Sequence, residues 1–283
     1  MTCYHPIDAF QPVAGGRLTF KPSLWKKLWV NERPVGIPCR QCIGCRLDYA
    51  RDWSLRMMHE ASMHEHNWFV TLTYRPDVLP ENSDLCYSDF QKFMKRLRKA
   101  LGNTRVRFYV AGEYGTKTAR PHWHVILFGL PLTDLKVYKR KADYPLFTSE
   151  WLADIWSYGN VVIGEVTPAS TNYVAGYVIA RDTDKFSEQY LNIDEHGVID
   201  SDDDGRIIVR RREFAKCSTN PGIGRKYFDD NCLTIMEHDA VMVGKYRKKF
   251  LGTMLKFGKN AILMGLRVLV RRVWNGLQRT VQK

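Results

Sequence analysis

Two histidines separated by a single tryptophan, His122 and His124, interrupt the apolar stretch 120–129, RPHWHVILFG. Side chains alternate between the two faces of a β-strand, so residues two apart project from the same side. The two imidazoles therefore form a pair on one face, and imidazole nitrogens are common ligands of divalent metals. The pair makes a bidentate metal site a working hypothesis, because His-x-His alone also occurs often by chance.

A glutamate could complete that site. Residues 105–115 predict a second strand, joined to the histidine strand by a short polar loop, and the two strands form a β-hairpin by their spacing. If the turn centres on 117–118, Glu113 lies directly opposite His122, and directly opposed residues share a face. A slip by one residue would turn Glu113 away, which leaves an exposed carboxylate at a strand end as the alternative.

Two tyrosines, Tyr173 and Tyr177, are spaced four apart in the stretch 168–182. The stretch begins with Ser/Thr capping candidates and predicts a helix, on which residues four apart lie on one face. Both phenol hydroxyls therefore emerge from the same side. Such a pair normally serves packing, and its spacing alone assigns it no function.

Cysteines at regular spacing suggest a second metal site. Cys39, Cys42 and Cys45 follow one another at Cys-x-x-Cys steps, which let thiolates converge on one tetrahedral metal, and Cys3 could supply a fourth ligand. Structural zinc is one interpretation, while an iron–sulfur cluster would accept the same run and unmetallated thiols are the alternative. An odd total of seven cysteines without a secretion signal argues against a disulfide framework.

The elements that must position these residues are recognisable by their periodicity. Apolar spacing predicts helices and aromatic, β-branched runs predict further strands: helices over 46–66, 88–101 and 148–159, and strands over 67–74 and 160–166. We therefore expect an α+β fold, a mainly antiparallel sheet with the His-x-His strand at its centre, flanked by helices. Three histidines in or near the first helix, His59, His64 and His66, follow no ligand spacing and are predicted to be solvated.

The chain is expected to have three parts. Residues 1–45 predict an irregular N-terminal arm with the cysteine cluster, residues 46–240 the main domain with an acidic insertion near 183–216, and residues 241–283 a basic amphipathic tail. The tail contains eleven Lys or Arg and no Asp or Glu.

Charge and composition narrow the class of protein. The net charge is +13, which suits a polyanion such as nucleic acid, with an anionic membrane surface second and solubility alone as the plain alternative. With 45% hydrophobic and 26% charged residues, the chain is typical of a globular protein. No apolar run is long enough to span a bilayer, and the N-terminus lacks the layout of a secretion signal. A cytoplasmic protein without stable membrane insertion is expected.

Three short motifs in this order resemble those of the HUH endonucleases, named for His–hydrophobe–His. They are FVTLTY (69–74), PHWHVILFG (121–129) and YVAGYVIAR (173–181). The two-tyrosine form resembles rolling-circle replication initiators of bacteriophages and some plasmids. The runs CRQCIGCR, FMKRLRK, AGEYG and NPGIG resemble the initiators of gokushovirus-type microviruses (Microviridae), over roughly residues 39–228.

The resemblance implies nicking of single-stranded DNA at a replication origin, for rolling-circle replication in the bacterial cytoplasm with host helicase and polymerase as partners. It implies a divalent cation, Mg²⁺ or Mn²⁺, on His122, His124 and Glu113. Tyr173 or Tyr177 would attack the phosphate, giving a 5′-phosphotyrosyl intermediate and a free 3′-OH. The family often has Lys three positions after the second tyrosine; this chain has Ala there, so a phosphate contact would pass to Arg181 or Lys185.

Other functions are compatible with the same residues. A related HUH transposase or plasmid relaxase is one alternative, and a non-catalytic, zinc-dependent nucleic-acid-binding protein is an alternative of another class. The basic face of helix 88–101 could contact a DNA backbone. Trp68, Phe69 and Tyr74 could stack on unpaired bases, although core packing is the more frequent role for the first two.

Overall fold

The computed structural model describes residues 3–12, 17–20, 32–115, 118–141, 144–177, 190–191, 201, 204–205, 207, 209–238, 240–243 and 246–249. It divides the chain into a larger unit, Arg40–Asp230, and a smaller one that combines Met1–Cys39 with Asn231–Lys283. The three-part division expected from the sequence stays a prediction.

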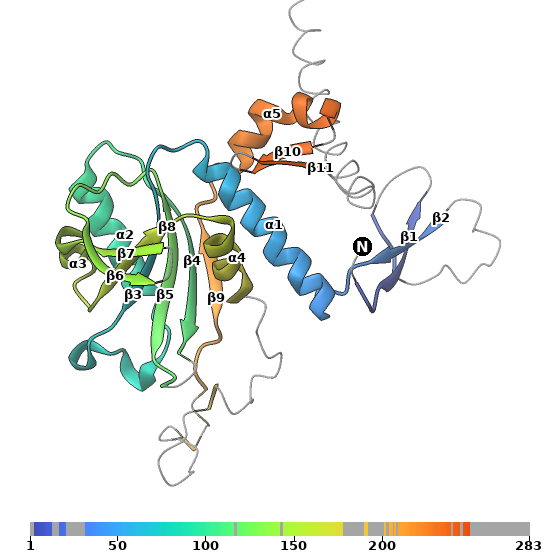
Figure 1. Ribbon diagram of the computed structural model, residues 1–283. Helices are drawn as coiled ribbons and strands as arrows, with labels where there is room; N and C mark the ends of the chain where they lie inside the picture. The colour runs from blue at the N-terminus through green and yellow to red at the C-terminus, as the bar shows by residue number, and fades with distance from the viewer. Residues whose placement is uncertain are drawn as a thin grey trace, which may run out of the picture. The chain divides into compact units, whose positions relative to one another are not determined.

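The larger unit is built on a seven-stranded sheet in which every pairing is antiparallel (Figure 1). Its strands are β3 (Asn67–Thr73), β4 (Arg107–Tyr114), β5 (Pro121–Phe128), β6 (Lys136–Lys141), β7 (Tyr144–Thr148), β8 (Val161–Glu165) and β9 (Phe214–Cys217). Their order is β6-β7-β8-β3-β5-β4-β9, so β5, the strand with both histidines, is an interior strand. The expected α+β class with an antiparallel sheet is confirmed.

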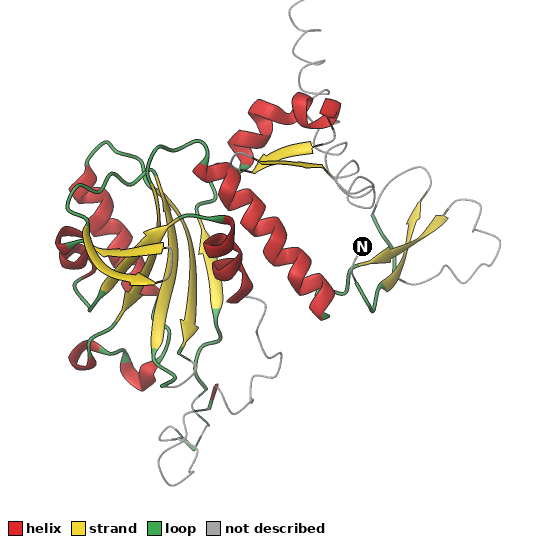
Figure 2. Cartoon of the chain, in the orientation of Figure 1, coloured by secondary structure: helices red, strands yellow, loops and turns green. Residues whose placement is uncertain are grey.

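Helices cover both faces of this sheet (Figure 2). They are α1 (Ile43–Ala61), α2 (Tyr87–Leu101), α3 (Glu150–Trp156) and α4 (Pro168–Tyr177), with short 3-10 turns at Pro76–Val78 and Glu81–Ser83. A further helix, α5 (Arg225–His238), follows β9. The predicted helix over 46–66 thus ends earlier than expected, and residues 178–182 of the predicted tyrosine helix lie outside the described residues.

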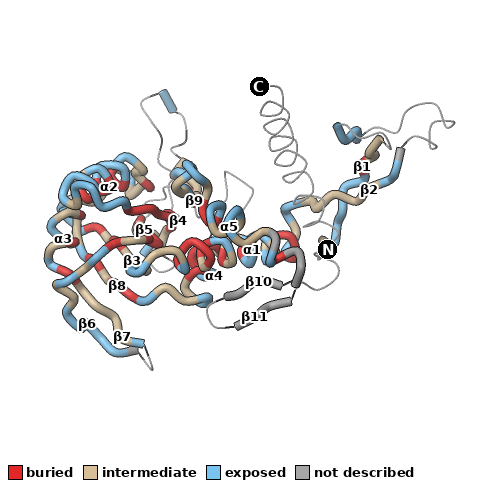
Figure 3. The backbone as a smooth tube through the Cα atoms, turned by 90° about the horizontal axis from the view of Figure 1, so that it is seen from above, coloured by how far each residue is buried: buried red, intermediate tan, exposed pale blue. Residues whose placement is uncertain are grey.

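Two hydrophobic cores lie on opposite faces of the sheet. In the first, the apolar stripe of α2 is fully or almost fully buried against β5 residues Trp123, Val125 and Leu127. In the second, residues of α1 and α4 pack against Ile126 and Phe128. Because side chains of a strand alternate, His122 and His124 lie on the face of Ile126 and Phe128, which is the face that α1 and α4 cover. Figure 3 shows the burial along these elements.

The smaller unit contains two short antiparallel ribbons. β1 (Ile7–Pro12) pairs with β2 (Glu32–Ile37), and β10 (Ala240–Val243) pairs with β11 (Tyr246–Lys249). The expectation of an irregular N-terminal arm was therefore wrong. These strands show no apolar alternation, and Pro12 and Pro34 lower their strand propensity, so only pairing with each other reveals them. The predicted amphipathic segment of the tail lies outside the described residues.

Across the described ranges, none of the helices is both long and apolar enough to cross a membrane.

Candidate metal and nucleophile site

The β4–β5 hairpin brings a carboxylate and two imidazoles together. Glu113 lies directly opposite His122, so the predicted register is confirmed. One oxygen of Glu113, Oε1, lies 2.5 Å from Nε2 of His122 and 2.8 Å from Nε2 of His124. One ligand atom from each of the three residues lies within 4.8 Å of the others. The three side chains therefore converge as a metal site requires.

The other nitrogen of each imidazole is held from behind. Nδ1 of His122 donates to the carbonyl oxygen of Arg120 at 3.1 Å, and Nδ1 of His124 lies 3.1 Å from the hydroxyl of Thr71 on β3. Such partners fix the orientation of the ring and direct Nε2 towards the shared position. Thr71 pairs with His124 across β3 and β5. The sequence analysis gave Thr71 no role; strand alternation in FVTLTY was the one signal that could have suggested it.

The protonation of the three groups reflects burial opposed by mutual contact. Burial raises the pKa of Glu113, but hydrogen bonds from the two histidines more than offset it and hold the pKa below its ordinary value. Burial lowers the pKa of His122, yet the Glu113 carboxylate brings it above the ordinary value. The more deeply buried His124 keeps a lowered pKa despite the same carboxylate. Glu113 is therefore a charged, buried carboxylate at neutral pH.

A divalent cation fits this group of residues. The second carboxylate oxygen of Glu113, Oε2, is buried and has no hydrogen-bond partner among the described residues. A buried oxygen without a partner is costly unless a cation or a proton donor satisfies it. Two imidazole nitrogens with a carboxylate suit Mn²⁺, whereas Mg²⁺ prefers oxygen ligands.

Tyr173 lies beside this group. Its ring centroid is 5.2 Å from that of His124, with the planes at 76°. Phe69 completes the cluster, stacked on His124 at 5.5 Å and edge-on to Tyr173 at 6.2 Å. Tyr173 is 49% exposed, so its phenol can meet a ligand from solvent. Burial, and then the charge of Glu113, raises the pKa of Tyr173.

Comparison with known proteins identifies the family of this arrangement. The family model for replication-associated proteins of the ORF2 type matches residues 67–182, which include β3, β4, β5 and α4. Replication-associated protein ORF2 of Spiroplasma virus 4 is 31% identical over 268 residues, 86% of this chain and 74% of that protein. The chain belongs to the phage replication-associated proteins.

Two further relatives have the same kind of name. Replication-associated protein VP4 of Bdellovibrio phage phiMH2K is 38% identical over 189 residues, 64% of this chain and 58% of that protein. Replication-associated protein ORF4 of Chlamydia phage 1 is 30% identical over 230 residues, 78% of this chain and 53% of that protein. The chain thus spans little more than half the length of these two relatives. No solved structure matches it significantly.

Helix α1 holds α4, and with it Tyr173, on the sheet. The buried hydroxyl of Ser54 on α1 lies 2.8 Å from that of Thr171 on α4 and donates to the carbonyl of Pro168 at 3.3 Å. Val174 and Ala175 of α4 are fully buried in the same core. Tyr177, the last residue of α4, follows one turn after Tyr173; its side chain lies outside the described part of the structure.

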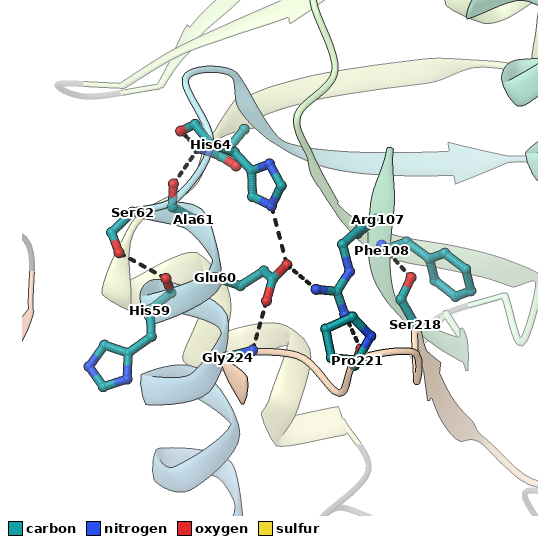
Figure 4. Close-up of polar contacts among 11 residues, drawn as sticks. His59, Glu60, Ala61, Ser62, His64, Arg107, Phe108, Ser218, Pro221 and Gly224 are labelled. Carbon is teal, nitrogen blue, oxygen red and sulfur yellow. Dashed lines mark hydrogen bonds and ion pairs between the residues drawn. The ribbon is translucent and has the colours of Figure 1, made fainter. Parts of the chain in front are cut away.

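A buried ion pair anchors α1 in turn (Figure 4). The carboxylate of Glu60, fully buried in α1, lies 2.7 Å from Nη1 of Arg107 on β4. The same carboxylate accepts the backbone N–H of Gly224 at 2.7 Å and lies 3.2 Å from Nε2 of His64. Arg107 also donates to the carbonyl of Pro221. The network therefore links α1, the sheet and the turn 219–224.

Some expectations for this region were wrong. His59 is buried and stacks on Tyr227 with ring centroids 4.1 Å apart, and His64 contacts Glu60, so neither is a solvated histidine. Tyr74 cannot stack on bases, because it is 5% exposed and its hydroxyl accepts Nε1–H of Trp123. The core role was the correct alternative for such aromatics on β3 and the residue that follows it.

The remaining predicted site residues are not brought to this site. Arg181 and Lys185 lie outside the described residues. Cys3 and Cys39 belong to the smaller unit, where the backbone N–H of Cys39 donates to Sγ of Cys3 at 3.3 Å. Cys42 caps the start of α1 in the larger unit, and the buried Cys45 follows within the first turn; this candidate zinc site stays a prediction.

Proposed function

We propose that this protein is a replication initiator of the HUH type that nicks single-stranded origin DNA by tyrosine transesterification. The observation that carries the proposal is the position of the Tyr173 ring, edge-on to His124 in the Glu113–His122–His124 group. An interior His-x-His strand with a tyrosine helix packed against its face supports the HUH type of fold. The family membership supports a role in phage replication.

Glu113, His122 and His124 would hold a divalent cation, Mg²⁺ or Mn²⁺. When bound, such an ion polarises a phosphate oxygen and offsets negative charge that develops in the transition state. Thr71 and the carbonyl of Arg120 orient the two imidazoles towards it. Phe69 covers one face of His124 and limits the access of water there.

Tyr173 is the nucleophile that the described geometry favours. Its phenolic oxygen attacks the phosphorus of the scissile phosphodiester, a P–O bond forms, and the bond from phosphorus to the 3′ oxygen breaks. The phenolic proton leaves to solvent or a nearby base, and the 3′ oxygen takes up a proton to become the free 3′-OH. A raised pKa means that the phenol of Tyr173 is protonated at neutral pH and needs this proton transfer.

A second tyrosine would make the reaction repeatable. Tyr177, one helical turn further along α4, could cleave a newly made origin while Tyr173 still holds the first end. A phosphate contact is proposed for Arg181 or Lys185. The free 3′-OH would prime synthesis by host helicase and polymerase in the cytoplasm.

A structural zinc site is proposed for Cys3, Cys39, Cys42 and Cys45. Within the smaller unit, the N–H···S bond to Cys3 is of the kind that thiolate ligands accept. Within the larger unit, Cys42 and Cys45 are three residues apart at the start of α1, and residues at this spacing are neighbours on a helix surface. Zinc content of the purified protein, lowered in Cys42→Ser but not in Cys86→Ser, is the test.

The nickase proposal is tested with a labelled single-stranded oligonucleotide that carries the phage origin, incubated with the full chain and Mn²⁺. We expect a denaturation-resistant protein–DNA adduct whose digestion gives a DNA-linked peptide containing Tyr173 or Tyr177. DNA binding without any adduct would favour the non-catalytic, zinc-dependent binding protein instead. An adduct on another residue would refute the assignment of the nucleophile.

A further inference from the structure

The hairpin of β6 and β7 carries exposed basic and aromatic side chains at one edge of the sheet. All residues from Lys136 to Arg140 are exposed, as the exposed colour along β6 in Figure 3 shows. Val137 and Tyr138 are 58% and 64% exposed, and Tyr144 on β7 is 64% exposed. Lysines alone protect an edge strand against aggregation. Exposed valine and tyrosine side chains are not explained by that role and indicate a binding surface.

The outer part of this hairpin stands clear of the sheet. A single residue pair, Phe147 with Ile163, connects β7 to β8. Phe147 packs against the core, whereas the described residues of β6 do not. The hairpin therefore presents a two-stranded antiparallel ribbon with both faces accessible.

Positive charge lies on both faces of the ribbon. Lys139 and Arg140 are consecutive, so their side chains project to opposite faces. Within the described residues, neither forms an ion pair, whereas Lys136 pairs with Glu150 at 2.7 Å. Lys139 and Arg140 are therefore the charges available to an anionic partner.

One face of the ribbon continues the face that carries the candidate active site. Lys139 lies opposite Leu146, so the two share a face. A Cβ atom at Gly164 would lie 3.5 Å from Leu146 and 3.6 Å from Phe69, which places these two side chains on the same face. Phe69 stacks on His124. Four strand spacings separate β5 from β6, or about 19 Å, so one DNA molecule can reach both places.

We propose that the β6–β7 hairpin binds duplex DNA next to the nicking site, with the ribbon in the major groove. The major groove is about 12 Å wide and admits a two-stranded β-ribbon. Charges on both faces can then contact phosphates on both walls of the groove, whereas a platform for a single strand needs only one exposed face. The inference rests on the proposed function only in taking DNA as the partner.

The test compares the full chain with the double variant Lys139→Gln, Arg140→Gln. Fluorescence anisotropy measures binding to a labelled 20-base-pair duplex over a series of salt concentrations, and a 20-nucleotide single strand is measured in parallel. A matched control, Lys216→Gln with Lys226→Gln, removes two exposed positive charges at β9 and α5. Thermal unfolding checks that each variant folds.

We expect the hairpin variant to bind the duplex roughly tenfold more weakly near 0.1 M salt, with the salt slope reduced by about 1.8, since each phosphate contact contributes about 0.9. Its adduct formation on the single-stranded origin should stay within about twofold of the unmodified chain. Unchanged duplex binding, an equal loss in the control, or a loss confined to the single strand would each overturn the proposal. A missing adduct in the unmodified chain would instead refute the nickase, without bearing on the duplex measurement.

Discussion

Thr71 on β3 and His124 on β5 lie directly opposite each other, with the threonine hydroxyl 3.1 Å from Nδ1 of the imidazole. The other nitrogen of His124 faces Glu113 at 2.8 Å. The hydroxyl therefore sets the direction of the nitrogen that would bind a cation, although Thr71 is itself no ligand. Residues with this position behind a metal ligand tune its affinity for the metal.

Thr71→Val should weaken Mn²⁺ binding roughly 10- to 100-fold, the usual effect of losing such a partner. The measurement is calorimetric titration of the metal-stripped protein. Thr73→Val serves as the control, because the Thr73 hydroxyl lies 3.5 Å from the carbonyl of Asn160 and contacts no imidazole. If both variants bind Mn²⁺ as the unmodified chain does, Thr71 does not position His124.

Tyr173→Phe should remove most covalent adduct formation on single-stranded origin DNA, because phenylalanine has no oxygen to attack phosphorus. The double variant with Tyr177→Phe should form none. Gel analysis after denaturation measures the adduct, and Tyr49→Phe, a change at a tyrosine that is 43% exposed on α1, is the matched control. Adduct formed by the double variant would exclude both tyrosines.

Glu60→Gln should lower the free energy of unfolding by about 3–5 kcal/mol at neutral pH, because it leaves the Arg107 charge buried without its partner. Urea unfolding measures the loss. Glu65→Gln, at a side chain that is 88% exposed, should change little. Equal stability of the two variants would contradict an anchoring role for the Glu60 network.

The same carboxylate predicts how stability depends on pH. Burial raises the pKa of Glu60, but hydrogen bonds from His64 and Gly224 and the charge of Arg107 bring it below its ordinary value of 4.5. A depressed pKa stabilises the fold above that value, and this stabilisation is lost as pH falls through the lower folded value. The stability difference between Glu60→Gln and the unmodified chain should therefore shrink below about pH 4.5; a constant difference would argue against it.

Two glycines should respond oppositely to alanine. A Cβ atom at Gly159 would lie 2.1 Å from the carbonyl oxygen of Thr73, between two backbone hydrogen bonds that fix the end of β3. Gly159→Ala should therefore destabilise the fold by about 1–3 kcal/mol. Gly176, in α4, has nothing within 4 Å of a Cβ position, and Gly176→Ala should stabilise by about 0.5–1 kcal/mol. Thermal unfolding of both decides; a stable Gly159→Ala would show that β3 can shift.

The sequence by itself determined the local pieces of the candidate site. The spacing of β4 and β5 predicted the hairpin and the pairing of Glu113 with His122, because a short turn leaves little choice of register. The apolar stripe of α2 predicted its buried face. Four-residue spacing predicted that Tyr173 and Tyr177 share one side of a helix. Each of these relations connects residues that are close in the chain.

Only the tertiary structure decided which of these pieces meet. Thr71 is 53 residues from His124, and no periodicity reports that their strands are neighbours. The pairing of β1 with β2, the β6–β7 hairpin, and the contact of Glu60 with Gly224 were also not visible in the sequence. A repeat of 2 or 3.6 residues shows which face of an element is apolar. It does not show which other face will cover it, because many apolar surfaces are equivalent until the whole chain packs.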